Sequence, residues 1–232
     1  EWFDYASYSY LATVIALVFF PGEDKMVSTM MTFGVFALAF LVRPLGAIFW
    51  GNMGDKKGRK WALSISILMM SGATFLIGCL PGYAVIGVGA PLLLLLMRMV
   101  QSFSASGEYA GAATFIAEYS PKNHRGFYCS MVPASTAVGL LVGSLFATWM
   151  FNTFGASSDF VVNWGWRIPF FLALPLGIIG LYLRHALEET PAFQQHVDTM
   201  EQGDREGLQD GPKVSFKEIA TKHWRSLLTC IG

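Results

Sequence analysis

Long uninterrupted runs of apolar residues dominate the pattern along the chain. Six runs stand out, each near or above the ~20 residues that a helix needs to cross ~30 Å of hydrocarbon. They cover residues 5–20, 27–50, 61–80, 91–119, 127–151 and 166–183. The runs are too long for strands and lack the alternation of a membrane barrel, and backbone inside hydrocarbon must satisfy its own hydrogen bonds. The pattern therefore predicts an all-α integral membrane protein with six spanning helices.

Basic residues are distributed unevenly among the connections between these runs. They gather after the second, fourth and sixth runs, at Lys56, Lys57, Arg59, Lys60, Lys122, His124, Arg125, Arg184 and His185. The alternate connections hold only Lys25 and, at an edge, Arg167. Because short Lys- and Arg-rich loops stay in the cytoplasm, the basic connections are expected inside. Trp164 and Trp166 are then expected in an aromatic belt at the outer interface.

Composition excludes several other classes of function. Hydrophobic residues make up 53% of the chain, charged residues only 14%, and the formal net charge is zero, so no nucleic-acid partner is expected. The three cysteines are scattered and the four histidines lack metal-ligand spacing. The sequence contains no phosphate loop or nucleophile elbow. We therefore expect no enzyme activity, no cofactor and no metal.

The character of the chain changes after the sixth run. We expect residues 1–187 to form a six-helix bundle, residues 188–222 a polar cytoplasmic linker, and residues 223–232 the start of a seventh span. The linker is expected to be solvated and without chemistry, as charge-rich segments usually are. On this interpretation the chain is a piece of a longer membrane protein.

The most specific motif is the decad GNMGDKKGRK at residues 51–60. It predicts a tight cytoplasmic turn, in which Gly51 and Gly54 allow close backbone approach and Gly58 adopts a positive φ. Asp55 is one acid among four bases and is expected to be paired, or to cap a helix N-terminus.

This decad resembles the loop motif of the major facilitator superfamily, and other segments resemble its metabolite:proton symporter family. Those segments are EWFDY at 1–5, RPLG at 43–46, GEY at 107–109, AEYSP at 117–121, WGWRIPFF at 164–171 and LEETPAF at 187–193. The resemblance covers nearly the whole chain. The sequence departs from the family pattern at two positions. Ser102 follows Gln101 where the family usually has glycine, and Ser106 replaces the first of two glycines before Glu108.

The resemblance implies a twelve-helix fold in two halves, of which this chain is the N-terminal half, with a solute site near the midplane and alternating access. The implied setting is the bacterial inner membrane. The implied partners are a small solute, protons, the lipid bilayer and the C-terminal half. It also implies a cytoplasmic gate, built from the decad and the ends of the fourth and fifth spans, with the residues Gly51, Asp55, Gly58, Arg59, Glu118 and Arg125.

Three polar residues lie inside the fourth apolar run. Arg98, Gln101 and Glu108 are three and seven residues apart, so they share roughly one helix face. Charges inside a membrane usually line a pathway or form a pair. Glu108 is therefore a candidate proton carrier, and a buried Arg98–Glu108 pair is the structural alternative.

Three more charged residues are candidates for the solute or proton pathway. Glu1 and Asp4 are expected at the inner end of the first span, where a helix start also favours acids at the interface. That placement leaves Glu108 as the one carboxylate deep in an apolar run. Arg43 precedes Pro44 late in the second run, and we expect it to extend towards the cytoplasmic face rather than bind a ligand.

The leading hypothesis is proton-coupled symport of a zwitterionic osmolyte such as proline or glycine betaine. A quaternary ammonium group suits an aromatic-lined site, for which Tyr5, Tyr8, Tyr10 and Phe103 are available. The alternative substrate is an organic acid such as a dicarboxylate, which would use Arg98 or Arg43. A membrane sensor without transport activity is the alternative of another class.

Overall fold

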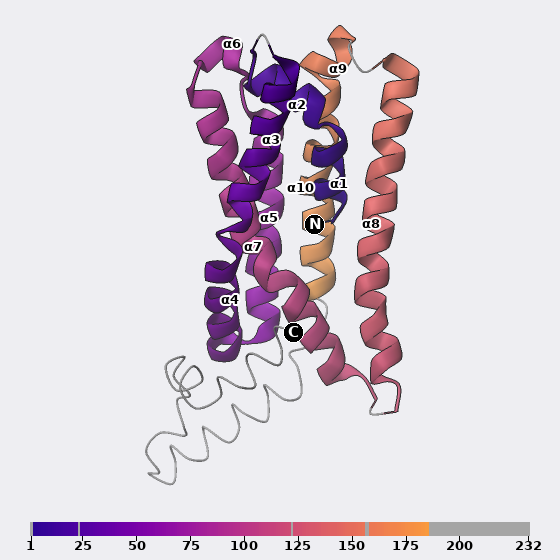
Figure 1. Cartoon of the computed structure of the whole chain (residues 1–232). Coiled ribbons are helices and arrows are strands. Elements are labelled where there is room, and N and C mark those ends of the chain that lie inside the picture. Colours follow the sequence, from indigo (N-terminus) through magenta and orange to yellow (C-terminus); the bar gives the residue numbers. More distant parts are fainter. Residues whose placement is uncertain (1, 23, 122, 156–157, 186–232) are drawn as a thin grey trace. The chain divides into compact units, whose positions relative to one another are not determined.

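The computed structural model describes residues 2–22, 24–121, 123–155 and 158–185, and within them it contains helices and no strand (Figure 1). The expected linker and seventh span lie outside the described residues. The helices are α1 (Trp2–Tyr10), α2 (Ala12–Phe19), α3 (Lys25–Phe40), α4 (Arg43–Lys57), α5 (Arg59–Cys79), α6 (Tyr83–Ile86), α7 (Gly89–Tyr119), α8 (Arg125–Phe154), α9 (Asp159–Asn163), the 3-10 turn η1 (Gly165–Arg167) and α10 (Ile168–His185).

Every predicted apolar run is helical. Within the described residues, four stretches are long and apolar enough to span a membrane: Lys25–Gly54, Arg59–Cys79, Arg125–Phe154 and Gly165–Leu183. The 31-residue helix α7 is longer than any span needs, but its charged and polar residues lower its mean hydropathy. The first predicted span is divided at Leu11 into α1 and α2, although backbone hydrogen bonds continue through the break.

The core lies where the first span packs among its neighbours. α1 contacts α8, α2 contacts α3, and α5 packs against both α7 and α10 (Figure 1). The buried apolar cluster contains Leu11, Ile15 and Phe19 of the first span, with Ile77 of α5 and Leu94 of α7. Many large apolar side chains elsewhere are exposed, as a protein whose surface faces lipid requires.

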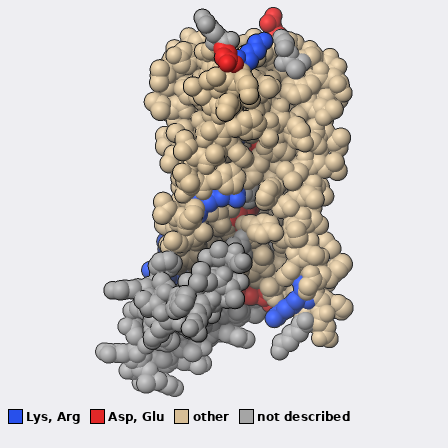
Figure 2. All heavy atoms as spheres, in the orientation of Figure 1, with Lys and Arg blue, Asp and Glu red and all other residues tan. Residues whose placement is uncertain are grey.

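Charged side chains are confined to parts of the surface. On the face drawn in Figure 2 most of them gather at the upper tip and in the lower half, and the surface between these two groups is mostly uncharged. A largely uncharged surface is what contact with the hydrocarbon region of a bilayer requires.

Trp166 corrects one sequence-based expectation. It is not in an exposed aromatic belt, because it is fully buried with its ring 5.5 Å from that of Phe19 and 5.9 Å from that of Phe170. Its neighbour Trp164 is 64% exposed and remains suited to an interface.

The second predicted span is interrupted between α3 and α4. The break falls at Leu41 and Val42, just before Arg43 and Pro44. Pro44 has no backbone N–H and restricts the residue before it, which explains why the helix restarts here instead of continuing. The break places Arg43 at the first position of α4.

The decad at residues 51–60 is not the loop that the sequence predicts. Residues 51–57 continue α4, and Gly58 alone connects it to α5. Gly58 has φ 97°, so the expected positive φ is confirmed. The expected close approach at Gly51 and Gly54 is wrong: a Cβ at Gly51 would meet nothing within 4 Å, and one at Gly54 would make only ordinary contact, 3.8 Å from Ala62.

Close helix packing is found instead on α7 and α8. A Cβ at Gly107 would collide with Trp50 of α4, and one at Gly111 would lie 2.7 Å from Leu63 of α5. On α8, a Cβ at Gly143 would lie 2.6 Å from Ala6 of α1. Gly107 and Gly111 form one GxxxG pattern, and Gly139 and Gly143 form another. These small residues therefore serve close packing, as GxxxG patterns commonly do in membranes.

Candidate functional site

Asp4 lies in the interior of the bundle. Asp4 is 4% exposed, and the hydroxyl of Thr74 in α5 donates a hydrogen bond of 3.3 Å to its Oδ2. The expectation that Asp4 sits at an interface, leaving Glu108 as the one deep carboxylate, is therefore wrong. Hydropathy places Asp4 just outside the first apolar run, but neighbouring helices enclose it. Glu1 lies outside the described residues.

Thr74 connects Asp4 to the polar face of α7. Gln101 Nε2 donates to Thr74 Oγ1 at 2.7 Å, and Arg98 NH1 donates to Gln101 Oε1 at 2.6 Å. Arg98 and Gln101 are both 1% exposed, so this chain of hydrogen bonds is buried. The predicted common face of Arg98 and Gln101 is confirmed. We call Asp4, Thr74, Gln101 and Arg98 the buried polar network.

The hydroxyl of Thr74 gives this network two arrangements. A hydroxyl has one proton to donate, and two acceptors are within reach: Asp4 Oδ2 at 3.3 Å and the backbone oxygen of Met70 at 2.9 Å. When Asp4 is ionised, Thr74 can donate to it. When Asp4 is protonated, it can donate to Thr74, whose own proton then goes to Met70. A change in the protonation of Asp4 would therefore reverse the direction of the bond between Asp4 and Thr74, and the bonds from Thr74 through Gln101 to Arg98 can persist in both arrangements.

Arg98 is stabilised by an aromatic ring as well as by Gln101. Its Cζ lies 3.6 Å from the centroid of the Tyr8 ring, and the Tyr8 hydroxyl donates to the backbone oxygen of Thr32 at 3.0 Å. Buried guanidinium groups gain from such stacking. Tyr8, expected to be available to a solute, is therefore occupied by Arg98, and Phe103 packs against Phe49 instead.

The structural alternative of an Arg98–Glu108 pair is not observed. Among the side chains that the structure describes, Arg98 makes no ion pair with Glu108, and its Nε and NH2 atoms have no hydrogen-bond acceptor. Glu108 is half-buried, seven residues further along α7 than Gln101. Its part in proton transfer stays a prediction.

Arg43 does not extend to the cytoplasmic face as expected. Its NH2 donates a 2.6 Å hydrogen bond to the hydroxyl of Tyr5 in α1. Its Cζ lies 4.7 Å from the ring centroid of Phe40 and 5.3 Å from that of Tyr5. Arg43 therefore joins the broken second span to the first.

Two of the residues expected to form the cytoplasmic gate, Arg59 and Glu118, are in contact, and their gating role stays a prediction. Arg59 Nε lies 3.2 Å from Glu118 Oε1, which joins the start of α5 to the end of α7. The side chain of Asp55 is outside the described set. Arg125 is exposed at the start of α8 and has no ion pair with the side chains that are described.

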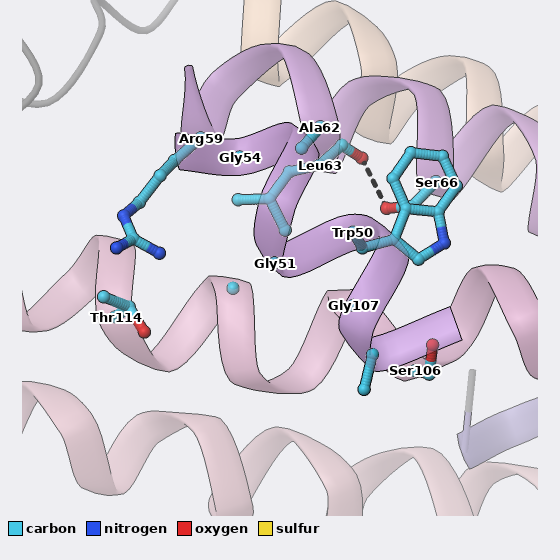
Figure 3. Close-up of a pocket in the computed structure, with 12 residues that line it drawn as sticks. Trp50, Gly51, Gly54, Arg59, Ala62, Leu63, Ser66, Ser106, Gly107 and Thr114 are labelled. Carbon is cyan, nitrogen blue, oxygen red and sulfur yellow. Dashed lines mark hydrogen bonds between the residues drawn. The ribbon is translucent and has the colours of Figure 1, made fainter. Parts of the chain in front are cut away.

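Beside this ion pair, α4, α5 and α7 enclose a small pocket (Figure 3). Trp50 and Leu63 project into it, and Arg59 reaches from α5 towards Thr114 of α7. The pocket holds about 110 Å³, less than typical ligand sites of ~300–1,000 Å³. It is therefore a packing defect where helices cross, and not a solute site.

Comparison with known proteins identifies the scaffold. The profile of the family described as "Sugar (and other) transporter" matches residues 1–229, nearly the whole chain. The chain belongs to this transporter family.

Curated members of the family resemble the chain along its full length. The proline/betaine transporter of Salmonella typhimurium is 58% identical over all 232 residues. The glycine betaine/proline/ectoine/pipecolic acid transporter of Dickeya dadantii is 53% identical over the same length. In both comparisons the match takes up 46% of the relative, so the chain spans about half the length of these transporters.

Solved structures show the same fold. The partially occluded, inward-open xylose transporter of Escherichia coli superimposes with a TM-score of 0.71 over 88% of this chain and 49% of that one, at 18% identity. A second structure of a xylose transporter, described as a major facilitator proton:xylose symporter, gives 0.65 over 90% of the chain. The chain therefore has the fold of the N-terminal half of a major facilitator transporter. The bacterial relatives, together with the described helices that are long and apolar enough to cross a membrane, indicate a multi-pass protein of the bacterial inner membrane.

Thr74 is the one member of the buried polar network that sequence reasoning did not identify. A threonine in an apolar helix carries no distinctive pattern, because its hydroxyl can bond to the carbonyl one turn earlier, as it does here with Met70. Only the packing of α5 against α7, and the hydrogen bond from Thr74 to Asp4 of α1, show its part.

Proposed function

We propose that the full-length transporter containing this chain is a secondary transporter that couples proton entry to uptake of a zwitterionic osmolyte such as proline or glycine betaine. No covalent step is involved, and solute and proton move because access to the site alternates between the two sides of the membrane.

The observation that supports this proposal most directly is the buried polar network. It joins a carboxylate on α1 to a guanidinium on α7 through Thr74 and Gln101. Buried ionisable groups within membrane spans usually mark ion or solute pathways. A buried carboxylate that is bonded to a neighbouring helix can link proton binding to a change in helix packing.

The substrate class rests on the relatives. Those described above are named as transporters of proline, betaine and related compounds, and they match this chain at 53–58% identity. These solutes carry both a carboxylate and an ammonium group. Their binding site therefore needs a contact for each charged group but no excess charge of either sign.

Uptake into proteoliposomes tests the proposal. Reconstituted full-length transporter should accumulate labelled proline and glycine betaine when the outside is acidic relative to the lumen, and a protonophore should abolish the accumulation. Succinate, a dicarboxylate, and xylose serve as the comparison solutes. Accumulation of succinate without either zwitterion would overturn the substrate assignment, and absence of uptake for every solute would favour a sensor.

A further inference from the structure

A second cavity, larger than the pocket near Arg59, opens between the helices. It is lined by residues of α1, α3, α4, α7 and α8, and it holds about 780 Å³. That volume falls within the range of small-molecule sites, ~300–1,000 Å³. We call it the Arg43 cleft, after the one formally charged residue among the described residues that line it.

The other polar groups of the cleft are weak candidates for holding an anion. Ser106 donates its hydroxyl proton to the backbone oxygen of Phe103 at 2.7 Å, and Thr136 donates to that of Pro133 at 2.6 Å. A hydroxyl has only one proton to give. Arg43 is different, because a guanidinium has five N–H donors in a planar fork that matches a carboxylate.

Arg43 is also rigidly placed. Tyr5 accepts its hydrogen bond and, with Phe40, packs against the guanidinium. The break between α3 and α4 fixes its backbone, and Pro44 after the break lines the same cleft. Irregular backbone at membrane depth is tolerated where it borders a cavity, and broken helices commonly form solute sites in transporters.

Aromatic rings supply the complementary surface. Trp2 and Tyr109 line the cleft with Arg43, and the Trp2 ring meets that of Tyr5 edge to face, with centroids 5.8 Å apart. Indole is the best partner for a quaternary ammonium group. The cleft therefore offers a cation for one end of a zwitterion and aromatic faces for the other.

We propose that the Arg43 cleft is the solute site of this half, with Arg43 binding the carboxylate of a zwitterion and Trp2 facing its ammonium group. The proposal rests on the proposed function, since it names where that solute binds. It separates the solute site from the buried polar network, which would handle the proton.

The test compares two ligands that differ in the carboxylate. Glycine betaine and choline share a trimethylammonium group, but choline carries a hydroxyl in place of the carboxylate. Both are measured as inhibitors of labelled proline uptake by the reconstituted full-length transporter. Arg43→Gln should reduce the preference for glycine betaine over choline by about tenfold or more, as expected for loss of a charged hydrogen bond.

Three further variants make the result interpretable. Arg43→Lys keeps the charge but not the fork, so it should reduce the preference less, and it serves if Arg43→Gln does not reach the membrane. Trp2→Leu should weaken both trimethylammonium ligands and leave their ratio unchanged. Lys25→Gln, at the exposed start of α3, removes a positive charge away from the cleft and should behave as wild type.

The outcomes separate the two proposals. If both Arg43 variants keep the wild-type preference while proline uptake is normal, the carboxylate binds elsewhere and the inference is overturned, although the transport function stands. If the wild-type protein takes up neither proline nor glycine betaine, the proposed function fails, and the inference fails with it.

Discussion

Asp4 and Glu108 are the two described carboxylates with a claim to the transported proton, and the structure surrounds them differently. Asp4 is buried and bonded to Thr74, which connects it to α7. Glu108 is half-buried on α7. Since a proton must alter helix contacts in order to be coupled to transport, we expect the more deeply buried Asp4 to be the carrier.

Replacing each carboxylate by its amide distinguishes them. Asp4→Asn keeps a group of the same shape but cannot exchange a proton, so it should abolish accumulation driven by a pH gradient while solute exchange at equal concentrations continues. Glu108→Gln should retain accumulation at a reduced rate. Both are measured as uptake and as counterflow in proteoliposomes, with expression checked.

The reverse result would reassign the carrier. If Asp4→Asn accumulates solute with an unchanged pH profile and Glu108→Gln does not, Glu108 carries the proton, as the sequence alone suggested. If both variants accumulate normally, the carrier is on neither residue.

The individual residues show which parts of a site are predictable from sequence. The shared face of Arg98 and Gln101 is predictable because they are three residues apart on one helix, and helix geometry alone brings them together. The burial of Asp4 and the orientation of Arg43 are not predictable in this way, because both depend on contacts between spans that are far apart in sequence. Hydropathy reports how apolar a segment is, and not which helix covers it.

At the scale of helices, α7 owes its position to small residues. Gly107 faces Trp50 of α4 and Gly111 faces Leu63 of α5, without room for a Cβ at either glycine. The decad motif, by contrast, predicts close packing at Gly51 and Gly54, and the structure shows none at either glycine. The long apolar runs predict the spans well, but they cannot show that helix α4 extends to Lys57 or that one residue makes the turn.

A pair of alanine substitutions tests this packing. Gly107→Ala should destabilise the protein by about 1–3 kcal/mol, the usual cost of overpacking, because the added methyl group would collide with the Cβ of Trp50. Gly51→Ala is the matched control, since its Cβ would meet nothing within 4 Å. Thermal unfolding of the detergent-solubilised transporter, followed by size-exclusion fluorescence, should show a lower midpoint for Gly107→Ala alone. Equal midpoints would mean that α4 and α7 separate readily.

At the scale of the whole molecule, the ion pair between Arg59 and Glu118 connects two spans at the end expected to face the cytoplasm. Both side chains are about three-quarters buried, at 30% and 22% exposure. An ion pair that forms in only one conformation biases the equilibrium between conformations. This is the physical basis for expecting a gate here.

A charge exchange tests the gate. Arg59→Glu and Glu118→Arg should each slow transport several-fold, because loss of a partly exposed ion pair costs about 1 kcal/mol and each variant also creates a like-charge contact. The double exchange should restore part of the rate. Single variants that transport at the parental rate, with normal expression, would show that the pair plays no part in cycling.

Asp55→Asn is expected to alter cycling in the same assay and to leave folding intact.

Orientation is a further prediction for the molecule as a whole. The Lys- and Arg-rich connections should face the cytoplasm, so Lys56 should be inside and Asp159, at the start of α9, outside. In a background without native cysteines, an impermeant maleimide should label Asp159→Cys in sealed cells and Lys56→Cys only after permeabilisation. Labelling of Lys56→Cys in sealed cells would invert the topology.

The single-residue turn at Gly58 bears on how the chain is inserted during synthesis. With one residue between them, α4 and α5 form a helical hairpin, with Lys56, Lys57, Arg59 and Lys60 at its tip. We expect the two helices to insert together as this hairpin. Moving four basic side chains through the membrane is strongly unfavourable, so the tip is expected to stay on the side of the ribosome. A turn that positions two helices in the mature protein would then also direct their biogenesis.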